Sequence, residues 1–184
     1  MNSRVLKPRH GPSILVRPLQ DGDIDTVLAV LHRLTEDSRR RRSGGAKARL
    51  TEDELWELSR VDATHHALVA YVESDRDPVA MARLVRDGAS AAIAFEVAGD
   101  YQRRGIGSAL TEQLLADARA AGITEITALV ANDNPAAVAL LRRALDTLEI
   151  SLEGSELWIR AMLPRLSPLH GATLREANVG YPAR

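Results

Sequence analysis

The 184-residue chain contains no cysteine. That absence excludes disulfide bonds, zinc sites built on thiolates and a cysteine nucleophile. No apolar run approaches the roughly 20 residues that a membrane-spanning helix needs. Residues 1–12 also lack the apolar core of a secretion signal. We therefore expect a cytoplasmic protein with no membrane partner.

Lysine is scarce as well, since it occurs only at Lys7 and Lys47 and nearly all positive charge comes from arginine. The formal net charge is −1, so the chain as a whole gives no electrostatic argument for a nucleic acid partner. Hydrophobic residues make up 45% and charged residues 27%, which is ordinary for a globular protein. The length suits one domain.

Two common phosphate-binding motifs are missing too: the P-loop G-x-x-x-x-G-K-[ST], and a G-x-G-x-x-G followed by an acidic residue at the dinucleotide-binding spacing. Instead, the apolar segment 91–98 predicts a buried strand, and Gln102-x-x-Gly105-x-Gly107 follows it. Apolar residues then recur at helical spacing from Ile106 onward. Such a strand–loop–helix unit binds anions, because the free N–H groups of the first helical turn point at the ligand. The alternative is a plain turn whose glycines only allow tight packing.

Apolar periodicity predicts a mixed α/β fold of order β-α-α-β-β-β-α-β-α-β-β. We expect a flexible leader at 1–13, a single domain at 14–163 and a loose C-terminal tail at 164–184. Residues 38–49, which include Arg39–Arg42, are predicted to form a mobile basic loop. Strands are predicted at 14–17, 67–73, 79–86, 91–98, 125–131, 150–152 and 157–162, and helices begin near Asp23, Thr51, Ile106 and Pro135.

The segment V-A-x-x-Y-Q-R-R-G-I-G-S-A-L resembles the GNAT superfamily of acetyl-CoA-dependent N-acyltransferases, and the order of elements over residues 14–163 is similar to that family's. The resemblance implies a mostly antiparallel central sheet flanked by helices, acetyl-CoA as co-substrate and no metal. It implies that the backbone of Val97 and Ala98 meets the pantetheine arm. The pyrophosphate would be held by the matching loop residues, which are Gln102, Arg103, Arg104, Gly105, Ile106, Gly107 and Ser108. Asn134 matches the family's N-x-x-A-x-x-x-Y stretch, although a helix N-cap explains it equally well.

Glu96 is the one charged residue in the apolar segment 91–98. A charge there is costly unless it is solvated, paired or protonated, and strand alternation also allows it to face solvent. The phrase A-x-A-F-E-V-A-x-x-x-Q-x-R-G-I-G is similar to bacterial protein lysine acetyltransferases of the Pat type. That resemblance implies that Glu96 is the general base. A base is useful because a lysine amine, with a pKa of about 10.4, is protonated at neutral pH.

The sequence departs from the family at Leu141, where a tyrosine would protonate the departing CoA thiolate. We therefore assign no general acid. The leading interpretation is transfer of acetyl to a protein lysine, with a small-molecule amine as the variant. A non-catalytic module that binds or senses acyl-CoA is the alternative. The oligomeric state is left as monomer or homodimer.

Two further features have a functional and an ordinary interpretation. Arg39–Arg42 would suit an acidic acceptor surface, because the corresponding region borders the acceptor site in the family, but such runs are usually only solvated. His65 and His66 form a pair without a third metal ligand, so an ordinary surface role is favoured over a metal site.

Overall fold

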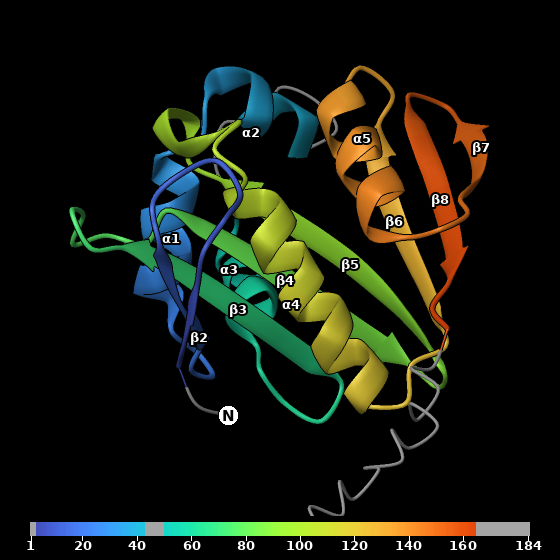
Figure 1. Cartoon of the computed structure of the whole chain (residues 1–184), viewed down its shortest axis with the longest axis horizontal. Coiled ribbons are helices and arrows are strands. Elements are labelled where there is room, and N and C mark those ends of the chain that lie inside the picture. The colour runs from blue at the N-terminus through green and yellow to red at the C-terminus, as the bar shows by residue number, and fades with distance from the viewer. Residues whose placement is uncertain (1–2, 43–49, 165–184) are drawn as a thin grey trace, which may run out of the picture.

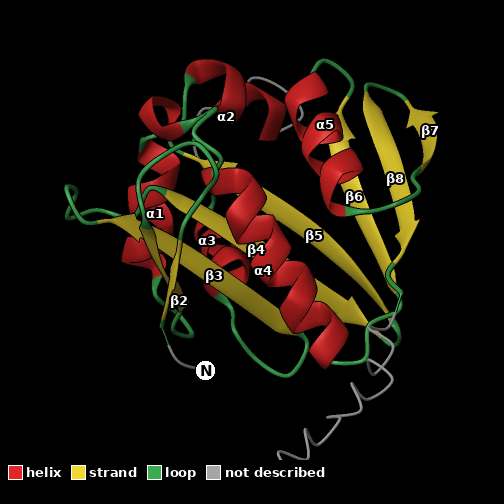
Figure 2. Cartoon of the chain, in the orientation of Figure 1, coloured by secondary structure: helices red, strands yellow, loops and turns green. Residues whose placement is uncertain are grey.

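The computed structural model describes residues 3–42 and 50–164. These ranges form one sheet of eight strands with helices on both faces (Figure 1, Figure 2). The strand order is β1-β2-β3-β4-β5-β6-β8-β7. All neighbouring strands are antiparallel except β5 and β6, which are parallel. The predicted mixed and mostly antiparallel α/β fold is therefore confirmed.

Apart from β1 and α2, which are not predicted, the elements lie close to the predicted ranges. The strands are β1 (Arg4–Leu6), β2 (Ile14–Pro18), β3 (His65–Val72), β4 (Ala80–Asp87), β5 (Ser90–Val97), β6 (Glu125–Ala131), β7 (Glu149–Glu153) and β8 (Glu156–Met162). The helices are α1 (Ile24–His32), α2 (Glu36–Arg42), α3 (Glu52–Ser59), α4 (Ile106–Ala120) and α5 (Pro135–Ala144), with a short 3₁₀ turn, η1 (Gly99–Tyr101).

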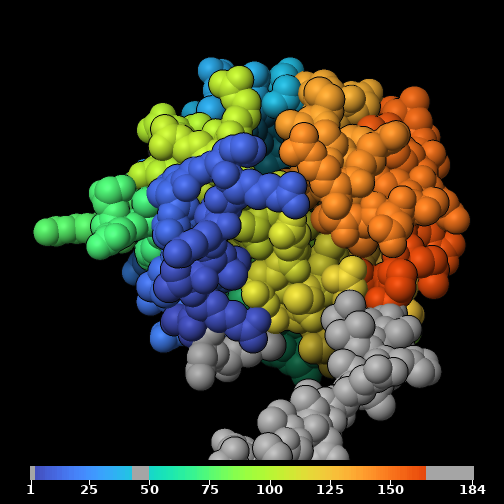
Figure 3. Space-filling view, in the orientation of Figure 1, coloured from blue at the N-terminus to red at the C-terminus, as the bar shows by residue number. Residues whose placement is uncertain are grey.

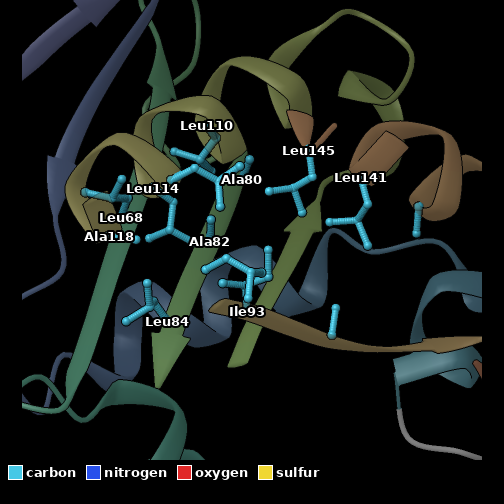
Figure 4. Packing of buried hydrophobic residues seen from close by; sticks show 14 of the residues in the cluster. Leu68, Ala80, Ala82, Leu84, Ile93, Leu110, Leu114, Ala118, Leu141 and Leu145 are labelled. Carbon is cyan, nitrogen blue, oxygen red and sulfur yellow. The ribbon is translucent and has the colours of Figure 1, made fainter. Parts of the chain in front are cut away.

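Helices α4 and α5 cover one face of the sheet and close the larger core (Figure 4). Leu110, Leu114 and Ala118 recur every four residues along α4, so they lie on one side of that helix, and all three are buried. Helix α4 ends where Gly122 adopts a φ of 77°, the left-handed conformation that commonly terminates helices. The core residues labelled in Figure 4 come from β3, β4, β5, α4 and α5 and from Leu145 directly after α5.

Helices α1 and α3 cover the opposite face with a second apolar cluster, which includes Val27 and Val30 of α1, Leu58 of α3 and Met81 of β4. The sequence fixes the start of α3 through a capping box. Thr51 accepts from the backbone N–H of Glu54, and the Glu54 carboxylate accepts from the N–H of Thr51.

The N-terminal segment differs from the prediction. Arg4–Leu6 forms β1 and pairs antiparallel with β2, in the register Arg4↔Val16 to Leu6↔Ile14. The expectation of a flexible leader is therefore wrong for these three residues, because β2 supplies a partner edge. Three residues are too few for periodicity to reveal. The predicted tail lies outside the described residues from 165 onward.

The basic run also differs from the prediction. Arg39–Arg42 is not a loop but the last part of helix α2, whose first turn carries the acidic residues Glu36 and Asp37. Acidic residues at the start and basic residues at the end of a helix both interact favourably with its dipole. The rest of the predicted loop, 43–49, lies outside the described residues.

Candidate active site

The candidate site begins where β5 and β6 diverge. Their parallel pairing covers only Ser90↔Glu125, Ala91↔Ile126 and Ala92↔Thr127. Figure 1 shows the two strands close at this end and apart at their carboxyl ends, where α2 and the start of α5 lie. Among the described strands, the second half of β5 therefore pairs only with β4.

The backbone of β5 faces this divergence at every second residue. Ala98 donates its N–H to the carbonyl of Val79 on the β4 side, at 2.8 Å. In an antiparallel ladder, the adjacent pair Val97↔Ala80 then directs its backbone groups away from the partner strand. The same alternation applies to Phe95. Val97 and Phe95 thus direct their N–H and C=O groups to the β6 side, where an extended ligand would lie; the carbonyl of Val97 already accepts there from the side chain of Gln102.

The glycine-containing segment 102–108, which we call the anion loop, follows directly. Arg103 and Gly105 have φ values of 58° and 76°, and glycine adopts this left-handed region without steric cost. Gly105 is the N-cap of α4 and provides no side-chain hydrogen bond to the helix. The N–H groups of the first turn therefore receive no side-chain cap, and binding of an anion by Ile106, Gly107 and Ser108 stays a prediction.

Both glycines of the anion loop lie against other segments. A Cβ added to Gly105 would lie 3.2 Å from Pro8 Cβ and 3.4 Å from the carbonyl oxygen of His10. One added to Gly107 would lie 3.1 Å from Leu140 Cδ1 and 3.4 Å from Val97 Cγ2. The loop is thus enclosed by the turn between β1 and β2 on one side and by β5 and α5 on the other. Figure 3 shows the N-terminal residues lying over the start of α4.

Gln102 anchors the anion loop to its surroundings. Its side-chain amide donates to the carbonyl oxygen of Val97 and to Ser38 Oγ, each at 3.1 Å. The first bond holds the loop against the end of β5, and the second connects it to α2. Arg103 and Arg104 are exposed, as is common for arginines that meet phosphate groups or only water.

Glu96 is buried, with a relative exposure of 8%. Its Oε1 lies 3.4 Å from Arg42 Nε and 3.9 Å from Arg83 Nη2. Its Oε2 is buried and has no hydrogen-bond partner among the described residues. Burial lowers the pKa of the Arg83 guanidinium, and the nearby Glu96 acts in the opposite direction. The interpretation of Glu96 as a solvent-facing residue is therefore wrong.

Glu96 and the anion loop lie on different sides of β5. Glu96 is paired across the ladder with Met81, which belongs to the α1–α3 face. Val97, the next residue, contacts Gly107 on the α4 face. A single ligand can contact both Glu96 and the anion loop only if it is extended and passes between β5 and β6 along the edge of β5.

The remaining arginines of α2 join the two sides of the divergence. Arg40 Nη2 lies 3.1 Å from Asp133 Oδ2, and Arg41 Nε lies 3.0 Å from Asp133 Oδ1. Asp133 belongs to the turn between β6 and α5, whereas Arg42 reaches Glu96 on β5. Arg39 donates to the carbonyl of Leu34 at 2.8 Å.

Asn134 caps α5, because its side chain accepts from the N–H of Ala137 at 3.2 Å. Helix capping is thus the role that the structure describes, and a role in cofactor binding stays a prediction. Leu141 is fully buried in the larger core. It supplies no polar atom to the site.

A cluster that sequence reasoning missed lies next to the anion loop. The Tyr101 hydroxyl donates to Asp75 Oδ2 at 3.0 Å, and Arg33 forms an ion pair with the same oxygen. Arg33 also donates a hydrogen bond to this oxygen, and that bond is the main reason why the pKa of Asp75 is lowered to about 2. The guanidinium carbons of Arg33 and Arg104 lie 5.4 and 5.3 Å from the Tyr101 ring centre. Arg33 and Asp75 lie far in sequence from each other and from Tyr101, so no local pattern predicts the cluster.

The histidines make ordinary side-chain contacts. His65 lies 3.1 Å from Glu57 and 3.0 Å from Asp62, and His66 lies 3.1 Å from Asp117. In the ranges 3–42 and 50–164, no group of three or more potential ligands is arranged to hold a metal ion. Nor does any helix there have the length and apolar character needed to cross a membrane.

Comparison with known proteins gives consistent matches. Residues 30–146 match the model of the acetyltransferase (GNAT) family. The chain is 32% identical over 156 residues to acetyltransferase Pat of Mycolicibacterium smegmatis, covering 83% of this chain but 44% of that protein. The chain thus spans less than half the length of that curated relative.

Solved structures show the same fold. The GNAT domain of S. lividans PAT superposes with a TM-score of 0.78 at 24% identity, covering 88% of this chain and 97% of that one. A PaiA N-acetyltransferase from Thermoplasma acidophilum, solved with coenzyme A, has a TM-score of 0.59 at 15% identity, covering 81% of this chain and 98% of that one.

Proposed function

The chain belongs to the acetyltransferase (GNAT) family, and we propose that it is an N-acetyltransferase that moves acetyl from acetyl-CoA to the side-chain amine of a protein lysine with Glu96 as the general base. The observation that carries this proposal is the buried carboxylate of Glu96. One of its oxygens has no hydrogen-bond partner in the described chain, and Val97, the next residue, faces the divergence of the sheet.

The chemical groups of coenzyme A match the groups that line the space between β5 and β6. The pyrophosphate of coenzyme A would accept from the free N–H groups at the start of α4. Arg103 and Arg104 add positive charge beside it. The extended pantetheine arm would pair with the backbone of Val97 in the manner of a strand. The expected contact with the backbone of Ala98 does not fit this arrangement, because Ala98 donates its N–H to the carbonyl of Val79 and accepts from the N–H of Tyr101. Supporting this assignment, the Thermoplasma acidophilum relative with the same fold was solved with coenzyme A.

The reaction requires a neutral amine. The amine nitrogen attacks the thioester carbonyl carbon, the carbon–sulfur bond breaks, and the CoA thiolate leaves. The proton released by the amine passes to Glu96, directly or through a water molecule. The thiolate then takes a proton from solvent, since Leu141 has no proton to donate. A thiolate is a tolerable leaving group, so this step does not require an acid.

A protein lysine is the favoured acceptor because the Mycolicibacterium smegmatis relative is an acetyltransferase of the Pat type. A small-molecule amine is the nearest alternative. A module that binds acyl-CoA without catalysis would explain Leu141, but it gives no reason for a buried carboxylate beside the cofactor path.

The test uses labelled acetyl-CoA with two acceptor pools from the same cell lysate: its dialysed proteins and its protein-free ultrafiltrate. Enzyme-dependent label in the protein pool, located on lysines by mass spectrometry, is the expected result. Label confined to the ultrafiltrate would replace the lysine acceptor by a small amine. Binding of acetyl-CoA without transfer to either pool would contradict the proposed activity.

A further inference from the structure

The carboxylate of Glu96 lies beside two largely buried guanidiniums. Both guanidiniums, from Arg42 and Arg83, lie beside Oε1, at 3.4 and 3.9 Å. Arg42 Nε makes no hydrogen bond in the described chain, and 3.9 Å is too long for one, so both contacts with Oε1 are electrostatic. Oε2 is buried and has no hydrogen-bond partner in the described chain. The carboxylate therefore lies between two positive charges, with one oxygen left for a further partner.

The two arginines come from different elements. Arg83 belongs to β4, next to β5 in the sheet, and both it and Glu96 lie on the α1–α3 face. Arg42 ends α2, and its side-chain exposure is only 20%, against 19% for Arg83. Helix α2 is itself fixed to the far side of the divergence, because Arg40 and Arg41 pair with Asp133. Glu96 thus lies between Arg83 on the neighbouring strand and Arg42 at the end of α2.

Stability alone is a weak reason for such a cluster. Taking charges out of water costs free energy that mutual attraction often fails to recover. The Nε atoms of Arg42 and Arg83 are buried without a hydrogen-bond partner in the described chain, so this cluster is incompletely satisfied. Incomplete satisfaction is typical of a functional site that meets its last partner only when substrate is bound.

We propose that Arg42 and Arg83 are positioning residues for the general base: their charges hold the carboxylate of Glu96 in place, and Oε2, which has no hydrogen-bond partner in the described chain, takes the proton from the acceptor amine. The proposal rests on the proposed function. In the step concerned, the lone pair of the neutral amine forms the bond to the acetyl carbon, and the carbon–sulfur bond breaks with its electron pair leaving on the CoA sulfur. An N–H bond of the attacking nitrogen breaks, its electron pair stays on nitrogen, and the proton joins Oε2. Neither arginine touches the reacting atoms. Each acts through Glu96.

The test is a pair of double-mutant cycles on the transfer rate, with labelled acetyl-CoA and dialysed lysate protein as the acceptor. Arg83→Gln and Arg42→Gln should each lower kcat about 10- to 100-fold, because a displacement of about 1 Å at a reacting group can cost that much. The KM for acetyl-CoA should stay within about twofold of wild type, since neither residue lies on the anion loop. In a Glu96→Gln background the same substitutions should lower kcat by less than about twofold.

Arg86→Gln is the matched control, because Arg86 lies on the same strand as Arg83 and its side chain donates to the carbonyl of Gly88 rather than contacting Glu96. It should leave kcat unchanged. Substitution of Arg83, which lies within β4, can also disturb folding. Arg42→Gln tests the same role with less risk of this, because Arg42 is the last residue of helix α2.

The outcomes separate the two claims. If the full loss persists in the Glu96→Gln background, the arginines stabilise the fold and the positioning role is wrong. If Glu96→Gln lowers kcat but neither arginine substitution does, the positioning role is wrong and the base remains. If Glu96→Gln alone transfers at the wild-type rate, it is the proposed function of Glu96 that fails.

Discussion

A negative charge at Gly105 should weaken acetyl-CoA binding without a matching loss of stability. Gly105 is the N-cap of α4, with a φ of 76° and no side chain to compete for the first N–H groups. Gly105→Asp places a carboxylate where we expect the pyrophosphate. Gly105→Asn is the matched control, since it has nearly the same shape, tolerates the left-handed conformation comparably and carries no charge.

The substitution has two separate costs, one in folding stability and one in acetyl-CoA binding. Both substitutions share the backbone strain and the contacts of the new Cβ with Pro8 Cβ at 3.2 Å and His10 O at 3.4 Å. The left-handed conformation costs about 1–2 kcal/mol for an ordinary L residue, and less for Asn and Asp. The charge adds a separate cost to binding. A carboxylate about 6 Å from one phosphate charge is repelled by about 0.7 kcal/mol at the dielectric constant of water and about 2.8 kcal/mol at an effective value of 20.

Calorimetric titration with acetyl-CoA and thermal unfolding of the free protein measure these costs independently. We expect Kd for Gly105→Asp to exceed that of Gly105→Asn by a factor of about 3 to 100. Their unfolding midpoints should be similar, and the difference in Kd should shrink in concentrated salt. An affinity for Gly105→Asp equal to that of wild type would refute the assignment of the anion loop.

Three other substitutions test the description of the fold. Leu141→Ala should lower the free energy of unfolding by about 2–5 kcal/mol in denaturant titrations, because Leu141 is fully buried; a loss below about 1 kcal/mol would contradict its place in the core. Asp75→Asn should destabilise the protein at neutral pH, where the carboxylate paired with Arg33 is ionised; since the pKa of Asp75 is lowered to about 2, the difference from wild type should fade as pH drops from about 4 toward 2. Gly11→Ala should lower the thermal midpoint more than Gly88→Ala, because both have positive φ but only Gly11 would bring a Cβ to 2.2 Å from a carbonyl of the anion loop; equal midpoints would show that the N-terminal turn does not pack there.

The fold was largely predictable because its long elements carry periodic apolar residues. Leu110, Leu114 and Ala118 mark one face of α4, and the apolar segment 91–98 marks β5. Helix α2 carries no such signal. Its last residues are four arginines, and described side chains of Asp133 and Glu96, which lie far along the chain, pair with three of them. A helix stabilised by distant ion pairs cannot be inferred from local pattern.

The candidate site was predictable only in part, for the same reason. Glu96 stands out because it interrupts an apolar strand, and the anion loop stands out through Gly105 and Gly107. The partners of Glu96 do not stand out, since Arg83 looks like any polar residue on a strand. The run that contains Arg42 suggested a surface for acidic acceptors. In the structure Arg40, Arg41 and Arg42 face carboxylates of the chain itself, which leaves less of their charge for a partner.

The pH dependence of transfer by Glu96→Gln, beside wild type, tests the central claim most directly. The substitution keeps the shape of the side chain and removes its basicity. We expect kcat to fall by roughly 10²–10⁴, with acetyl-CoA affinity nearly unchanged and the decline of the rate at acidic pH abolished. A variant that matches the wild-type rate at every pH would contradict the assignment of Glu96 as the base.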